Sequence, residues 1–131
     1  MNAEIAAHFG HLEQSLLDSD AVSSYVIIRR QVTPADGKVR IRARLKDGGS
    51  LELFEYVALE AGGQVVRLKY SYHWQNAEGV LIRRWDAVPH HPQLPYAPHH
   101  VHMPDNSVEA VAEPPDAIAV LAYIEAELRQ G

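Results

Sequence analysis

The sequence predicts an α+β fold: a five-stranded antiparallel meander with N- and C-terminal helices packed on one face. Apolar residues recur at helical spacing near each end of the chain, and between these ends apolar and polar residues alternate through five runs separated by short turn signals. No helical pattern interrupts the five runs, which disfavours a parallel βαβ arrangement. A chain of 131 residues has the size of one ordinary domain, so we expect a single domain over residues 1–131.

The first predicted helix covers residues 3–17, where apolar residues lie four, seven and eleven positions after the first: Ile5, Phe9, Leu12 and Leu16. We expect His8 and His11 to be solvated residues beside this stripe. The last helix begins at Pro114-Pro115-Asp116, because proline suits a first helical turn and an acid suits the positive end of the helix dipole. Its apolar stripe is Ala117, Leu121, Ile124 and Leu128.

The five predicted strands lie in the runs SYVIIRRQV, KVRIRARLK, SLELFEYVALE, QVVRLKYSYHWQ and VLIRRWD. A three-residue loop of Asp47-Gly48-Gly49, a two-residue turn at Gly62-Gly63 and a four-residue loop of 76–79 place the apolar side chains on one face. That face consists of Val39, Ile41, Ala43, Leu45, Leu51, Leu53, Val57, Leu59, Val66, Leu68, Tyr70, Tyr72, Trp74, Leu81 and Trp85. The first strand cannot be placed, because the loop TPADG allows either register.

The opposite face is predicted to be cationic. Its candidate nucleic-acid-binding residues are Arg40, Arg42, Arg44, Arg67 and Lys69. Tyr56, Ser71, His73, Arg84 and Asp86 share this face. In the predicted register Lys69 lies opposite Asp86 and Arg84 opposite Ser71, with His73 two residues further along, so basic, acidic and imidazole groups meet.

Charge is distributed unevenly along the chain. Residues 1–28 hold four acids and no Lys or Arg, residues 29–84 hold eleven bases against six acids, and residues 85–131 hold one base against seven acids. A basic middle between acidic ends favours contact with a polyanion or a strongly acidic partner, although a salt-bridged surface has the same composition.

Histidines are concentrated in residues 70–102, which hold six of the eight in the chain. Residues 87–106 hold five of the eight prolines, at positions 89, 92, 95, 98 and 104. We therefore expect this segment to be stiff and extended, and neither a helix nor a central strand.

Three chemistries fit this segment. Histidines could act as general acid and base on an RNA phosphodiester, with Arg84 and Lys69 stabilising the transition state and no metal required. Alternatively, His100 and His102 could chelate zinc or manganese together with Asp86 and one of His90, His91 or His99, in a metal-dependent nuclease or phosphodiesterase. The third possibility is a non-catalytic RNA- or protein-binding module. Trp85 or Tyr96 could stack a base, but the register places Trp85 in the core.

Other functional classes are excluded by composition. The chain has no cysteine, so it has no disulfide, no thiol nucleophile and no cysteine-ligated zinc. The N-terminus lacks the pattern of a signal peptide and no run approaches the ~20 apolar residues of a membrane span. We expect a cytoplasmic protein.

The stretch YSYHWQNAEGVLIRRWDAVPHHPQLPYAPHHVH resembles the signature of the TumE-type toxins of bacterial toxin–antitoxin systems. Shared features are a Tyr-x-Tyr-His-aromatic strand, an Arg-aromatic-Asp-x-x-Pro-His-His element and a His-x-His ending; Ala87 and Val88 depart from it. The resemblance implies growth inhibition by cutting or binding RNA, and a helix-turn-helix antitoxin as partner. It implicates Tyr72, His73, Arg84, Asp86, Pro89, His90, His91, His99, His100 and His102.

From the predicted register, we expect Asp86→Asn and His73→Ala each to abolish toxicity with little loss of thermal stability, because a carboxylate that orients an imidazole matters more to catalysis than to folding. His8→Ala and His11→Ala are expected to do neither.

Overall fold

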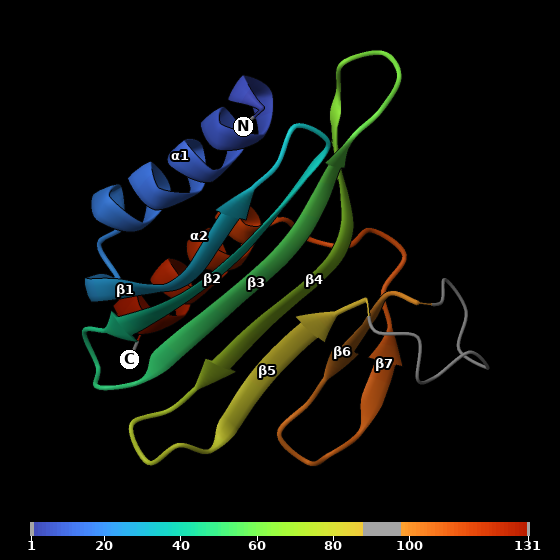
Figure 1. Cartoon of the computed structure of the whole chain (residues 1–131). Coiled ribbons are helices and arrows are strands. Elements are labelled where there is room, and N and C mark those ends of the chain that lie inside the picture. The colour runs from blue at the N-terminus through green and yellow to red at the C-terminus, as the bar shows by residue number, and fades with distance from the viewer. Residues whose placement is uncertain (1, 88–97, 131) are drawn as a thin grey trace.

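The computed structural model describes residues 2–87 and 98–130, and in these residues one antiparallel sheet lies against two helices (Figure 1). In chain order the elements are α1 (Ala3–Asp18), β1 (Val22–Val32), β2 (Asp36–Leu45), β3 (Ser50–Leu59), β4 (Val65–Gln75), β5 (Leu81–Asp86), β6 (His100–His102), β7 (Val108–Ala110) and α2 (Ala117–Gln130). The strands follow one another in the sheet in sequence order, which is a meander. The predicted α+β class is correct, but the described sheet has seven strands and not five.

The two additional strands are short. His100–His102 forms β6 between β5 and β7, so the expectation that this segment holds no central strand is wrong. Three residues are too few to show alternation, and the prolines at 98 and 104 lie outside the strand, where they remove no hydrogen bond from its ladder. β7 lies between this segment and α2, where no strand was predicted.

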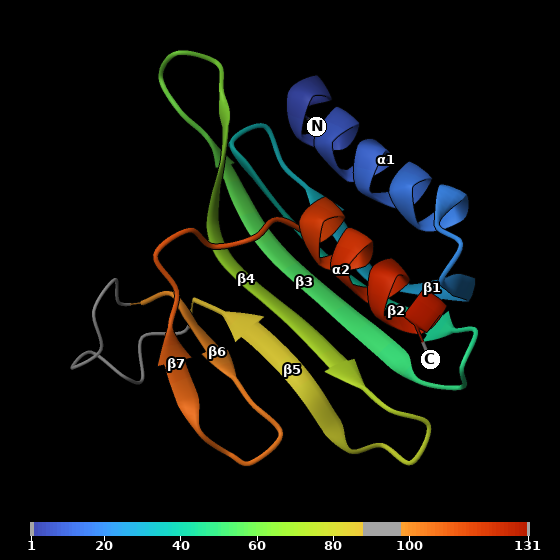
Figure 2. The same cartoon turned by 180° about the vertical axis from the view of Figure 1, so that it is seen from behind.

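Both helices lie on the same face of the sheet, as predicted (Figure 2). The apolar stripe of α1 is buried at Ile5, Phe9, Leu12 and Leu16. Gly37 permits this packing, because a Cβ at that position would lie 2.6 Å from Ile5 Cγ2. α2 starts where the Asp116 carboxylate accepts a hydrogen bond from the Ala119 amide at 2.8 Å. Trp85 belongs to this core, as expected.

The alternation predicted for β2 is confirmed, because Val39, Ile41, Ala43 and Leu45 are all buried. The loop after β2 again has three residues, but it lies one position earlier than predicted: the Leu45 amide donates to the Gly49 carbonyl at 2.9 Å. The one-position difference changes which residues pair without moving any side chain to the other face.

A bulge between Tyr56 and Val57 overturns one part of the predicted register. Glu55 pairs with Tyr70 as expected, but Val57 then pairs with Arg67 and not with Leu68. Leu68, predicted to be in the core, is 51% exposed. Arg67, predicted on the cationic face, lies on the helix side. An extra residue in one strand reverses the side-chain alternation beyond it.

The pairing of β4 with β5 is shifted by two residues. Asp86 lies opposite Ser71, and Arg84 lies opposite His73. An even shift preserves the faces, so His73, Arg84 and Asp86 still share the open face, but Lys69 does not lie opposite Asp86 as predicted.

A polar network crosses the helix-covered face around Glu55, whose side chain is 2% exposed. Its carboxylate accepts a hydrogen bond from the Tyr72 hydroxyl at 2.6 Å, and its other oxygen lies 2.7 Å from His8 Nε2. Arg67 donates to the Tyr72 hydroxyl and to the Pro115 carbonyl, at 2.7 Å each. His8 is therefore part of a buried network and not merely a solvated residue of α1.

We predict that His8→Ala lowers the free energy of unfolding by about 1–2 kcal/mol, because it leaves one oxygen of a buried carboxylate without its donor. His11→Ala, on the exposed side of the same helix, serves as the matched control. Urea unfolding of the two variants checks this, and equal stabilities would contradict the role assigned to His8.

Candidate active site

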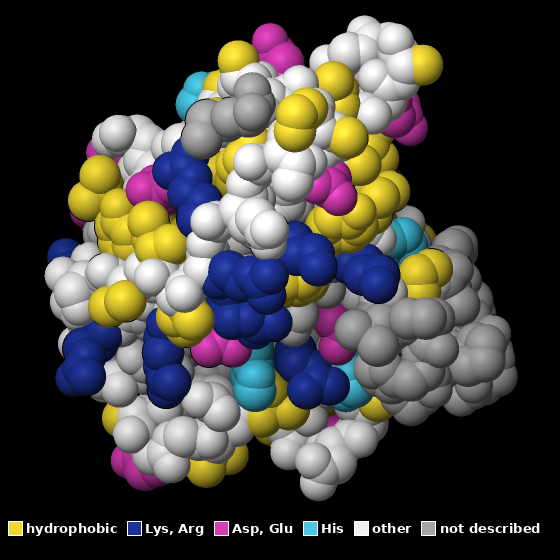
Figure 3. All heavy atoms as spheres, in the orientation of Figure 1, with side chains coloured by type: hydrophobic (Ala, Val, Ile, Leu, Met, Phe, Trp, Pro, Cys, Tyr) yellow, Lys and Arg dark blue, Asp and Glu magenta, His cyan; other side chains and the backbone are white. Residues whose placement is uncertain are grey.

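The open face of the sheet arranges its side chains in rows that run across the strands. Antiparallel pairing aligns one row, the His73 row, through Arg42, Glu52, His73, Arg84 and His102. The neighbouring Asp86 row runs through Arg40, Phe54, Ser71, Asp86 and His100. Figure 3 shows this face, with Lys and Arg side chains across its middle and His side chains beside them. The candidate site lies where the two rows cross β4, β5 and β6.

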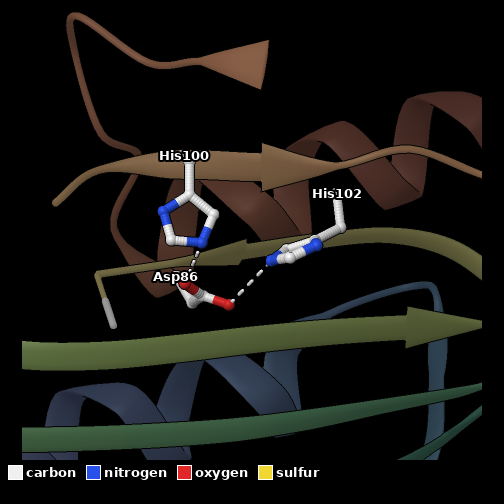
Figure 4. A group of neighbouring side chains, drawn as sticks. All are labelled: Asp86, His100 and His102. Carbon is white, nitrogen blue, oxygen red and sulfur yellow. Dashed lines mark ion pairs between the residues drawn. The ribbon is translucent and has the colours of Figure 1, made fainter. Parts of the chain in front are cut away.

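Asp86, at the end of β5, is the centre of the site, and its side chain is only 2% exposed. One carboxylate oxygen lies 2.6 Å from His100 Nε2, and the other accepts a hydrogen bond from Arg84 Nε at 3.0 Å. His102 Nε2 is 3.3 Å from that second oxygen (Figure 4). A buried carboxylate requires such compensation, because transferring a charge out of water is costly unless it is paired.

His100 is buried, and both of its ring nitrogens face oxygen acceptors. Nδ1 lies 2.7 Å from the Pro98 carbonyl, and Nε2 lies against Asp86. The two contacts fix the orientation of the His100 ring between Pro98 and Asp86. The contact between His100 and Asp86 joins β6 to β5 through side chains as well as through the backbone ladder.

Arg84 and His102 are the more accessible members, with side chains 34% and 14% exposed. Arg84 Nη2 lies 3.0 Å from His102 Nε2. Because a guanidinium only donates, Nε2 of His102 is the acceptor in this contact. Arg84 thus connects a buried carboxylate to a partly buried imidazole.

His73 lies on β4 directly opposite Arg84 and is partly buried. Burial lowers the pKa of His73 below its ordinary value, and the nearby positive charge of Arg84 lowers it further, while Glu52 opposes the shift. The imidazole is therefore neutral at pH 7, the form in which it accepts a proton.

Cationic side chains extend the open face away from this centre. Arg40 pairs with Glu52 at 3.0 Å and stacks over Phe54, whereas Arg42, Arg44 and Lys69 make no ion pair with any residue that the structure describes. Lys38 also belongs to this face: it precedes Arg40 by two residues, so the same alternation could have included it. Of the predicted nucleic-acid-binding residues, only Arg67 is on the wrong face.

Two other predicted site residues lie away from the Asp86 centre. Tyr72 is fully buried on the helix side, in the network with Glu55. His99 stacks on Tyr70 and its Nδ1 lies 3.0 Å from the Tyr70 hydroxyl, so it also faces away from Asp86. His90 and His91 lie outside the described residues. Ala87, where the resemblance fails, is buried in the core.

Asp86, His100 and His102 form a group that could hold a metal ion, since one ligand atom from each lies within 4.8 Å of the others. Carboxylate and imidazole suit zinc or manganese, and the Pro98 carbonyl on His100 Nδ1 is a common second contact of a metal-bound histidine. However, Arg84 donates to two of the three ligand residues, so a metal would have to displace it.

No helix in the described parts of the chain is long and apolar enough to cross a membrane.

The fold and the site define a class: a small α+β protein with a cationic open sheet face and an Asp-His-Arg centre. The family model described as Toxin TumE matches residues 12–131, and the chain therefore belongs to the TumE toxin family. Searches of the curated proteins and of the solved structures found no match. The resemblance noted in the histidine-rich segment is thus confirmed over nearly the whole chain.

We predict that Arg84→Gln raises the pKa of His73 toward its ordinary value of 6.5, because it removes a positive charge that disfavours the imidazolium. The shift is partial, since burial remains the larger cause. NMR titration of the His73 ring protons measures it, with Arg129→Gln on α2 as the control; an unchanged titration curve in Arg84→Gln would contradict the assigned contact.

The same pKa shift has a consequence for stability. The folded state binds the His73 proton less firmly than the unfolded chain does. The contribution of neutral His73 to the free energy of unfolding is therefore fully present above pH 6.5, and it is lost as the pH falls through the lowered pKa of His73 in the folded state.

Proposed function

We propose that this toxin inhibits growth by cutting RNA without a metal ion, with the scissile phosphate on Arg84 between His73 and His102. The observation that carries the proposal is the order of these three residues in one row across β4, β5 and β6. Strands lie about 4.8 Å apart, so the two histidine backbones are about 10 Å apart with the arginine midway. A phosphate on Arg84 then has an imidazole on either side, as in-line displacement requires.

The reaction assigns one proton transfer to each imidazole. Neutral His73 takes the proton of a ribose 2′-hydroxyl, whose oxygen attacks the neighbouring phosphorus. The bond from phosphorus to the 5′-oxygen breaks, leaving a 2′,3′-cyclic phosphate, and the departing oxygen receives a proton from His102. Arg84 stabilises the negative charge that accumulates on the phosphoryl oxygens.

Substrate binding favours the uptake, from solvent, of the proton that His102 donates. In the free protein its Nε2 accepts from Arg84. When Arg84 turns to the phosphate, this nitrogen faces the Asp86 carboxylate, 3.3 Å away, and a neighbouring negative charge stabilises an imidazolium. Asp86 and His100 act through His102 and Arg84, and they are positioning residues.

The surroundings of the row support RNA as the substrate. Arg40, Arg42, Arg44 and Lys69 extend the same face and provide contacts for a phosphate backbone. We expect the protein to act in the cytoplasm, where its target would be available. Membership of a toxin family implies an antitoxin partner, for which we retain the helix-turn-helix type suggested by the resemblance.

A metal-dependent nuclease is the alternative that a specific observation favours, namely the convergence of Asp86, His100 and His102. In that reaction the metal would supply Lewis acidity and His73 would remain the base. Activity that is lost in chelator and restored by zinc or manganese would select it.

We predict that His73→Ala and His102→Ala each lower RNA cleavage by at least about 100-fold and remove toxicity on expression, while the thermal midpoint changes little. His11→Ala is the control for histidine loss. Cleavage by the parent protein should persist in chelator. Variants that remain toxic would show that the row is not the active site. If the parent protein binds RNA without cutting it, and the variants bind RNA equally well, a binding module is favoured.

Asp86→Asn tests the proposed reaction less directly than the two histidine variants, because it also affects folding. Because Asp86 is buried and compensates Arg84 and His100, removing its charge is expected to destabilise the fold by about 3–5 kcal/mol, contrary to the expectation from sequence alone.

A further inference from the structure

A groove on the open face lies outside the proposed reaction centre, with a volume of about 610 Å³. Val26 and Ile28 of β1 line one side, and Arg42 and Arg44 of β2 line it beside them. Gln75, the last residue of β4, and Asn76 in the following loop also border it. It therefore combines an apolar wall with two cations in one concave surface.

The positive charges that line this groove favour the binding of an anion. Arg42 and Arg44 are exposed, two residues apart on the same face, and neither makes an ion pair within residues 2–87 and 98–130. Neighbouring strand positions on one face lie about 7 Å apart, so an anion bound between the two guanidinium groups would be attracted by both.

The exposed apolar side chains of the groove favour an apolar ring system beside that anion. Val26 is 65% exposed and Ile28 is 52% exposed, although both are large hydrophobic residues. A ligand that carries phosphate and an apolar ring system satisfies both walls at once, and a nucleotide has this chemistry. The bases of single-stranded RNA are free to leave the stack and pack on a protein surface.

The groove lies in line with the proposed reaction centre. Arg42 is in the His73 row, three strands from Arg84. At about 4.8 Å per strand this separation is about 14 Å. Stacked nucleotides rise about 3.4 Å each, so about four of them span it.

We propose that this groove is a nucleotide subsite for single-stranded RNA, about four nucleotides from the phosphate cut at Arg84. Arg42 and Arg44 hold the backbone there, and Val26 and Ile28 contact a base. The inference rests on the proposed ribonuclease function and extends it by setting the substrate class and the length that the protein engages.

Binding of RNA oligonucleotides of increasing length tests the subsite. The measurement uses the full chain carrying His102→Ala, so that RNA is not consumed, and follows fluorescence anisotropy with a dinucleotide and an octanucleotide. We expect the octanucleotide to bind more tightly, since only it reaches the groove. In Arg42→Gln/Arg44→Gln its affinity should fall at least about tenfold, with a salt slope lower by about 1.4, because each phosphate contact on single-stranded RNA contributes about 0.7.

Two further variants separate this role from general charge loss. Val26→Ser should weaken octanucleotide binding without changing the salt slope, because it removes an apolar contact and no cation. Arg129→Gln, on the far side of the molecule, removes one positive charge and should leave both oligonucleotides unaffected.

The outcomes distinguish this inference from the function on which it rests. If the parent protein cuts RNA but affinity does not depend on length, or the double variant binds the octanucleotide like its parent, the subsite is wrong while the ribonuclease stands. A groove that serves a protein partner gives that same unchanged RNA binding and overturns the subsite. If the variants behave as expected but no RNA is cut, the subsite stands and the proposed reaction fails.

Discussion

Alternation of side chains along antiparallel strands is the constraint on which the rest of this structure depends. Both helices cover the same face of the sheet, so residues of one parity enter the core and residues of the other remain on an open face. On that open face, pairing aligns His73, Arg84 and His102 although they are far apart in sequence. The arrangement of the site is therefore a consequence of strand pairing.

Two buried carboxylates, one on each face, connect folding to the site. Glu55 on the helix side is compensated by His8 and Tyr72, and Asp86 on the open side by Arg84 and His100. An unpaired buried charge would cost several kcal/mol, so each carboxylate fixes its partners in place. Asp86 thus has a double role, since the contacts that stabilise β6 against β5 also orient the groups proposed to move protons.

The sequence predicted the parts of the fold that depend on alternation alone. The core positions of β2, the apolar stripe of α1 and the shared face of His73, Arg84 and Asp86 all follow from a period of two or of 3.6 residues. Features that depend on a single extra residue could not be predicted. Because of the bulge between Tyr56 and Val57, Arg67 lies on the helix side of the sheet. β6 has three residues, which are too few for a periodic pattern to be recognised. His8 had no local signal, because its partner Glu55 lies 47 residues away.

The product of RNA cleavage tests the central claim most directly. A short RNA is incubated with the purified protein in chelator, and a second RNA differs only by 2′-deoxy substitution at the cut site. If a 2′-hydroxyl attacks its own phosphate in the His73–Arg84–His102 row, the products carry a 2′,3′-cyclic phosphate and a 5′-hydroxyl, and the deoxy substrate is not cut. Cleavage of the deoxy substrate, or products with a 5′-phosphate formed only when metal is added, would contradict the account.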